Sequence, residues 1–125
     1  MSDSLDIITV GEAMAMFVAT ETGPLENVEH FIKRVAGAEL NVATGLARLG
    51  FRVGWVSRVG NDSHGRYVLE CLKREGIDTR AVTIDDRYPT GFQLKSKVGK
   101  TRHAGRVELT LRANRGKARH LYPPW

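Results

Sequence analysis

Residues 34–50 constrain the fold more than any other segment, because small residues and one polar residue stand directly before a periodic apolar stretch. Gly37 and Ala38 leave room for a ligand to approach the backbone, and Asn41 carries an amide that both donates and accepts hydrogen bonds. The apolar residues that follow recur at helical spacing, and Gly50 predicts the end of the helix. The start of such a helix can hold a polar or anionic ligand. The segment equally fits a tight turn in which the glycine serves packing and Asn41 caps the helix, so both interpretations stay open.

Three short apolar runs and a second periodic segment surround this stretch. Their order along the chain is strand, helix, strand, helix, strand, which favours a parallel sheet with crossover helices. Ligands of such sheets lie beyond the carboxyl ends of the strands. We therefore expect three dipeptides to lie near that edge: Gly11-Glu12, Gly37-Ala38 and Gly60-Asn61. The predicted strands cover residues 6–12, 51–60 and 77–84, and the second predicted helix covers residues 67–76.

The glycines and their neighbours together resemble those of the ribokinase-type (PfkB) carbohydrate kinases. The residues concerned are Gly11, Glu12, Gly37 to Asn41, Gly50, Gly60 to Asp62, Gly65 and residues 89–93. The resemblance covers residues 5 to about 98. The sequences of residues 37–43 and 89–93 are most similar to those of 2-keto-3-deoxygluconate kinases. Many sugar kinases of this family carry a Gly-Gly pair where this chain has Gly37 and Ala38. This difference argues against ribose as the substrate.

The resemblance implies the N-terminal part of an α/β, ribokinase-like fold, incomplete relative to the family: part of a parallel sheet with crossover helices, plus a small β lid. It implies a sugar pocket lined by Gly37, Ala38, Asn41 and Gln93, with Glu12 at a strand end. Gly37 and Ala38 would allow close approach, Asn41 would bond a hydroxyl, and Gln93 would reach in from the lid. The alternative for Gln93 is an outward residue of a half-exposed strand.

The reaction implied by the resemblance is ATP-dependent phosphorylation of a hydroxyl on a sugar or sugar acid, with 2-keto-3-deoxygluconate favoured and fructose or a nucleoside as alternatives. Such transfers depend on positioning, on Mg²⁺ and on a carboxylate that takes the hydroxyl proton. In this family that carboxylate belongs to a late Gly-x-Gly-Asp turn, whereas the last aspartate here is Asp86 and no Gly-Asp dipeptide occurs. We therefore expect a truncated, inactive, sugar-binding fragment, with no catalytic residue and no bound ATP or Mg²⁺.

Three further segments carry strand patterns that the resemblance assigns to a lid over the sugar. They are residues 13–19, 31–35 and 90–98, the last with alternating apolar and polar residues. In the family such strands form a small sheet that can also pair with a second subunit, so a homodimer through the lid strands is expected. The alternative is an ordinary edge sheet without a gating role.

The composition changes after Val98. Residues 1–98 hold 12 Lys and Arg against 13 Asp and Glu, whereas residues 99–125 hold seven basic residues and one acidic residue. We expect residues 1–98 to form the kinase-like part and residues 99–125 to be a non-homologous or disordered basic tail, with a short strand at 106–111. A shifted reading frame is one hypothesis for this change.

A basic tail could also bind nucleic acid, which makes a small nucleic-acid-binding protein the competing class. The scattered basic residues lack a common helical face, which argues against this alternative. The Gly99-Lys100-Thr101 tripeptide imitates the end of a phosphate-binding loop, but Leu94 stands where its first glycine belongs.

The remaining residues point to no metal, membrane or disulfide. Cys71 is the single cysteine and is expected to be a buried thiol, which fits a reducing cytoplasm. The four histidines have no metal-ligand spacing, and His64 is expected in a solvated turn. No stretch approaches the length of a membrane span.

Overall fold

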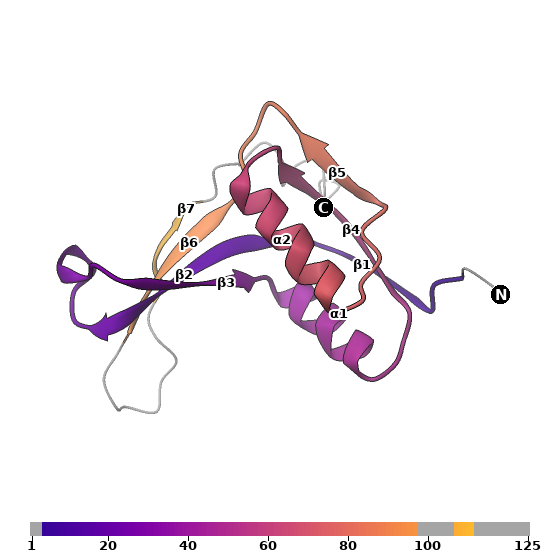
Figure 1. Ribbon diagram of the computed structural model, residues 1–125, viewed down its shortest axis with the longest axis horizontal. Coiled ribbons are helices and arrows are strands. Elements are labelled where there is room, and N and C mark those ends of the chain that lie inside the picture. Colours follow the sequence, from indigo (N-terminus) through magenta and orange to yellow (C-terminus); the bar gives the residue numbers. More distant parts are fainter. Residues whose placement is uncertain (1–3, 98–106, 112–125) are drawn as a thin grey trace, which may run out of the picture.

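The described part of the chain forms two small sheets, two α-helices and one short 3-10 helix, η1 (Leu25–Asn27) (Figure 1). A computed structural model describes residues 4–97 and the backbone of residues 107–111. The parallel sheet has the order β1-β4-β5, and a four-stranded sheet, called the lid sheet below, has the order β3-β2-β6-β7. The strands are β1 (Ile7–Val10), β2 (Met14–Thr22), β3 (Phe31–Ala36), β4 (Val53–Gly60), β5 (Val82–Asp85), β6 (Phe92–Lys97) and β7 (Val107–Leu111), and the helices are α1 (Ala38–Arg48) and α2 (Ser63–Arg74).

The hydrophobic core lies between the parallel sheet and the two helices. Trp55 of β4 is fully buried in this core, and Figure 1 shows α1 and α2 packed beside the strands of the parallel sheet. Both β1 and β5 pair in parallel with β4, so the predicted α/β architecture is confirmed. The buried core residues are Ala13, Leu40, Ala43, Val53, Trp55, Val59, Val68, Leu72 and Ile77.

The helix α1 ends as the sequence predicts, because Gly50 adopts a positive φ of 95° just beyond it. Its N-cap is Gly37, whose place in the helix start is not supported by a capping side chain from any described residue. Asn41 lies within the helix, where its N–H donates to the carbonyl oxygen of Gly37 at 3.0 Å. The interpretation of Asn41 as an N-terminal cap is therefore wrong.

The helix α2 begins four residues earlier than predicted, at Ser63, because Asp62 caps it by accepting a hydrogen bond from the N–H of Gly65. His64 consequently belongs to the first helical turn rather than to a solvated turn. Its ring meets Phe17 edge-on, with the ring centroids 5.4 Å apart, and its Nδ1 is buried. Cys71, farther along α2, is half-buried rather than buried.

The predicted third strand, residues 77–84, is interrupted. Asp78 forms an isolated parallel bridge with Gly54, and its N–H donates to the carbonyl oxygen of Val53 at 2.9 Å. A turn then follows, closed by a hydrogen bond from the N–H of Val82 to the carbonyl oxygen of Thr79. The strand β5 therefore begins only at Val82.

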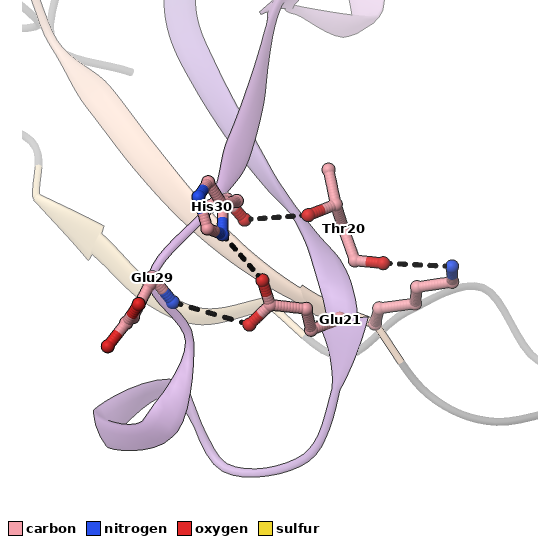
Figure 2. A network of polar contacts seen from close by, with 5 residues as sticks. Thr20, Glu21, Glu29 and His30 are labelled. Atoms are coloured by element: carbon pink, nitrogen blue, oxygen red, sulfur yellow. Dashed lines mark hydrogen bonds and ion pairs between the residues drawn. The ribbon is translucent and has the colours of Figure 1, made fainter.

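In the lid sheet, β2 pairs antiparallel with β3 and parallel with β6. Figure 2 shows the polar contacts at the far end of the β2–β3 hairpin, where Glu21 bonds the His30 ring at 2.8 Å and accepts from the N–H of Glu29. The hydroxyl of Thr20 donates to the carbonyl oxygen of His30 in the same network. These contacts fix the hairpin end, where the exposed Glu21–His30 pair adds little stability.

The strand β7 pairs antiparallel with β6, which confirms the strand expected at 106–111. The expected disorder of the remaining tail and the Gly99-Lys100-Thr101 tripeptide lie outside the described residues. Neither α1 nor α2 has the length and apolar character that a membrane crossing requires.

One face of the parallel sheet carries no helix in the described part of the chain. Ile8 and Val10 of β1 are 61% and 45% exposed there, and their register partners on β4 are Gly54 and Val56. Parallel sheets are usually covered on both faces. In this respect the described chain differs from a self-contained α/β unit, in which helices would cover both faces of the sheet.

Candidate functional site

The end of β1 and the start of α1 approach each other so closely that only glycine fits between them. A Cβ atom on Gly37 would lie 2.7 Å from the carbonyl oxygen of Glu12 and 3.3 Å from Cβ of Leu40. The φ angle of Gly37 is +154°, which also disfavours residues with a side chain. Two of the dipeptides predicted at the sheet edge, Gly11-Glu12 and Gly37-Ala38, are thus brought together.

The loop that leads into β6 reaches the same place. A Cβ atom on Gly91 would lie 3.1 Å from Oε1 of Glu12 and 3.2 Å from Cγ of Met14. The carbonyl oxygen of Gly91 accepts a hydrogen bond from the N–H of Ala15 at 3.1 Å. We call the meeting point of Glu12, Gly37 and Gly91 the glycine junction.

The glycine junction combines an acceptor with unused donors. The carboxylate of Glu12 is half-buried and has no hydrogen-bond or ion-pair partner within the described ranges. The first N–H groups of α1 lack a side-chain cap, and such groups remain free to donate. A ligand with several hydroxyl groups could therefore donate to Glu12 and accept from the start of the helix.

Gln93 lies on a lid-sheet face that leads to this junction. Its register partner on β2 is Met16, which is also paired with Arg34 on β3. Side chains of paired residues share a face of a sheet, as do residues two apart on one strand. Gln93 and Met16 therefore share one face with Met14, which lies beside Gly91 of the junction. Phe17 and Phe92 belong to the opposite face and meet His64 of α2. Gln93 is half-buried there.

Asn41 lies apart from the glycine junction. Its exposed side chain lines a groove of about 280 Å³ together with Arg34, Thr44 and Tyr67, between α1, α2 and the end of β3. The hydroxyl of Tyr67 donates to the carbonyl oxygen of Lys33 at 3.0 Å, and burial raises the pKa of this phenol. The structure thus brings Glu12 and Gly37 together, with Ala38 exposed beside them, and places Gln93 on the adjoining lid face and Asn41 one helical turn away.

Two residues without a sequence-assigned role form the tightest polar contacts near the junction. Asp62 accepts a hydrogen bond from the N–H of Thr90 at 2.7 Å, and the hydroxyl of Thr90 accepts one from the N–H of Gly60 at 2.9 Å. We call this set of contacts the latch. Burial raises the pKa of Asp62, but the hydrogen bonds from Thr90 and Gly65 outweigh it and hold the pKa below its ordinary value. Aspartate at a helix start was a visible signal for the cap, whereas nothing local in the sequence indicates its partner Thr90.

No group of three or more His, Cys, Asp and Glu side chains within residues 4–97 is arranged to hold a metal ion. The chemistry that the described residues do offer is the binding and orientation of a polar ligand.

Comparison with known proteins gives consistent matches. The family model described as pfkB family carbohydrate kinase matches residues 4–123. The 2-dehydro-3-deoxygluconokinase of Bacillus subtilis (strain 168) is 58% identical over 95 residues, which are 75% of this chain and 29% of that protein. The chain thus spans less than a third of the length of this curated relative.

Solved structures show the same fold. A crystal structure of a PfkB protein from Polaromonas sp. JS666 matches with a TM-score of 0.81 and 53% identity, covering 88% of this chain and 36% of that one. An uncharacterized sugar kinase from Pyrococcus horikoshii, solved in complex with ATP, matches with a TM-score of 0.75 and 35% identity, covering 83% of this chain and 33% of that one.

Proposed function

Because the chain belongs to the pfkB family of carbohydrate kinases, we propose that it binds the phosphate acceptor of such a kinase, a sugar acid of the 2-dehydro-3-deoxygluconate type. This compound is the 2-keto-3-deoxygluconate that the sequence favours. The 58% identity to a 2-dehydro-3-deoxygluconokinase supports it over fructose or a nucleoside.

The glycine junction is the observation that carries the proposal. Gly37 lets the segment after β1 pack closely against the start of α1, and the carboxylate of Glu12, which has no partner among the described residues, accepts a hydrogen bond from a sugar hydroxyl. Gln93 approaches from the lid face, and the backbone N–H groups at the start of α1 donate from the other side, whereas the side chain of Asn41 lines the neighbouring groove. The acceptor is held by hydrogen bonds from two sides, as orientation for phosphoryl transfer requires.

Phosphoryl transfer itself is assigned to groups that this chain does not supply. The donor in the family is ATP, and the related Pyrococcus sugar kinase was solved with ATP. In the family the carboxylate that takes the hydroxyl proton belongs to a late Gly-x-Gly-Asp turn, and these 125 residues contain no match to that turn. We therefore expect the chain to bind the acceptor and to form no ADP on its own.

An amide-resolved NMR titration of the full 125-residue chain tests this proposal. Addition of 2-dehydro-3-deoxygluconate should shift the amides of Gly37, Ala38 and Gln93, and fructose should shift them less. Glu12→Gln should weaken binding about tenfold, because it removes a charged hydrogen-bond acceptor.

The matched control is Glu26→Gln, which makes the same change at an exposed residue of the β2–β3 connection and should leave affinity unchanged. Tighter binding of fructose, or shifts confined to residues outside the junction, would contradict the assignment.

We also propose that two copies of this chain pair through their lid sheets. Ile32 of β3 is 45% exposed and is the register partner of Val18, so apolar side chains share an open lid face. Sedimentation velocity should show a dimer for the native chain and a monomer for Ile32→Lys, and a monomer in both cases would refute the pairing.

A further inference from the structure

The latch joins the lid sheet to the helical layer at one buried point. Thr90 is 3% exposed, and both its backbone N–H and its hydroxyl bond the carboxylate of Asp62. Its hydroxyl oxygen also accepts from the N–H of Gly60, so this hydroxyl both donates and accepts a hydrogen bond. The other carboxylate oxygen of Asp62 caps α2 by accepting from Gly65 at 2.7 Å. A single aspartate therefore fixes the start of a helix and the entry to a lid strand.

Close packing of glycine backbones leaves the latch no room to shift. A Cβ atom on Gly60 would lie 2.6 Å from the backbone nitrogen of Thr90. A Cβ atom on Gly65 would collide with the carbonyl oxygen of Gly60 and lie 3.0 Å from Oγ1 of Thr90. The loop before β6 is thus seated directly on the corner between β4 and α2.

A second contact fastens the lid sheet to the same helical turn. The ring of His64 packs edge-on against Phe17 of β2, and its centroid is 6.1 Å from that of Phe92 on β6. The first turn of α2 therefore holds both of the strands, β2 and β6, whose shared face leads to the glycine junction.

The path from the latch to the candidate site is short. Gly91, which packs against Glu12, directly follows Thr90, and Gln93 stands two residues farther on. A displacement of Thr90 would move Gly91 away from Glu12 and Gln93 away from the adjoining face.

We propose that Asp62 and Thr90 are positioning residues for the acceptor site: the latch sets Gly91 and Gln93 relative to Glu12 and Gly37, so that the site is formed before the ligand arrives. This inference rests on the proposed function. Its physical basis is preorganisation, because a site already held in its binding geometry loses less conformational freedom when the ligand binds. It also implies that the lid sheet moves with α2 rather than as a separate flap.

Thr90→Val tests the proposal, because it keeps the shape and the backbone N–H but removes the hydroxyl. The variant should bind 2-dehydro-3-deoxygluconate about tenfold more weakly than the native chain, and Thr90→Ser should restore affinity. The matched control is Thr83→Val, the same change at an exposed position of β5, which should leave affinity unaltered. Amide hydrogen exchange should accelerate at β6 in Thr90→Val while the core strand β4 stays protected.

The outcomes separate this inference from the proposed function. Native affinity and native β6 exchange in Thr90→Val would overturn the positioning role. If Thr90→Val does not fold by circular dichroism, Asp62→Asn serves instead, since asparagine also caps helices but its amide nitrogen cannot accept from Thr90. If the native chain binds no sugar acid, the proposed function fails, and β6 exchange alone decides: acceleration confined to β6 supports the latch, and unchanged exchange overturns it.

Discussion

Gly37→Ala and Gly45→Ala add the same methyl group to the two glycines of one short segment, and the structure predicts opposite effects on stability. Gly37 is the N-cap of α1 and belongs to the glycine junction, whereas Gly45 lies exposed within the same helix. The first substitution should lower the free energy of unfolding, and the second should raise it.

The magnitudes follow from the local geometry. At Gly37 the φ of +154° costs a residue with a side chain about 1–3 kcal/mol. The new methyl would also lie 2.7 Å from a backbone oxygen that cannot rotate away, and such overpacking costs about 1–3 kcal/mol more. At Gly45 no described atom outside the local helical backbone lies within 4 Å of the new methyl, and alanine in a helix interior gains about 0.5–1 kcal/mol over glycine.

The expected separation between the two variants is therefore about 4 kcal/mol, a large share of the roughly 5–15 kcal/mol that holds a typical domain folded. Urea unfolding followed by far-ultraviolet circular dichroism measures it, provided that the two variants and the native chain share one denaturant slope. The reasoning is refuted if both midpoints move in the same direction, or if Gly37→Ala stays within about 0.5 kcal/mol of the native chain.

Three further predictions concern other parts of the molecule. Ser57→Ala should raise the free energy of unfolding by about 1 kcal/mol, seen as a higher thermal midpoint, because the Ser57 hydroxyl is buried without a hydrogen-bond partner in the described part of the chain. Ile8→Thr should reduce binding of a hydrophobic dye while leaving the urea midpoint within about 0.5 kcal/mol, because Ile8 is 61% exposed on the uncovered sheet face. The depressed pKa of Asp62 stabilises the fold above its unfolded value of about 3.9, and this contribution disappears as the pH falls through the folded pKa. Urea midpoints should therefore fall more steeply below roughly pH 4 for the native chain than for Asp62→Asn; equal slopes would contradict the assignment.

The parts of the fold that depend on local pattern could be read from the sequence. The apolar spacing before Gly50 predicted α1, and the short apolar runs predicted β1 and β4, because helices and strands impose different periods on buried side chains. The interruption of the strand predicted over residues 77–84 could not be predicted, because the bridge from Asp78 to Gly54 depends on a strand far away along the chain. The start of α2 at Ser63 was also not predicted, although Asp62 is a residue type that favours the N-cap position.

The candidate site was predictable only in part, because its geometry depends on register and on long-range contacts. Gly37 and Glu12 were expected at one edge and do meet there. The placement of Gln93 on the face of Met14 requires the pairing of β2 with β6, which no local pattern encodes. The contact between Asp62 and Thr90 likewise joins residues from different elements, and only the folded chain reveals it.

The strand order of the lid sheet has a consequence for how the polypeptide assembles during synthesis. The β2–β3 hairpin can close as soon as it emerges from the ribosome, but β6 is made only after both helices. Until then β2 presents an unpaired edge, and such edges attract other extended chains. Pairing between distant segments is also slow relative to local structure. The nascent protein therefore passes through an interval in which this edge of β2 is open to incorrect pairing.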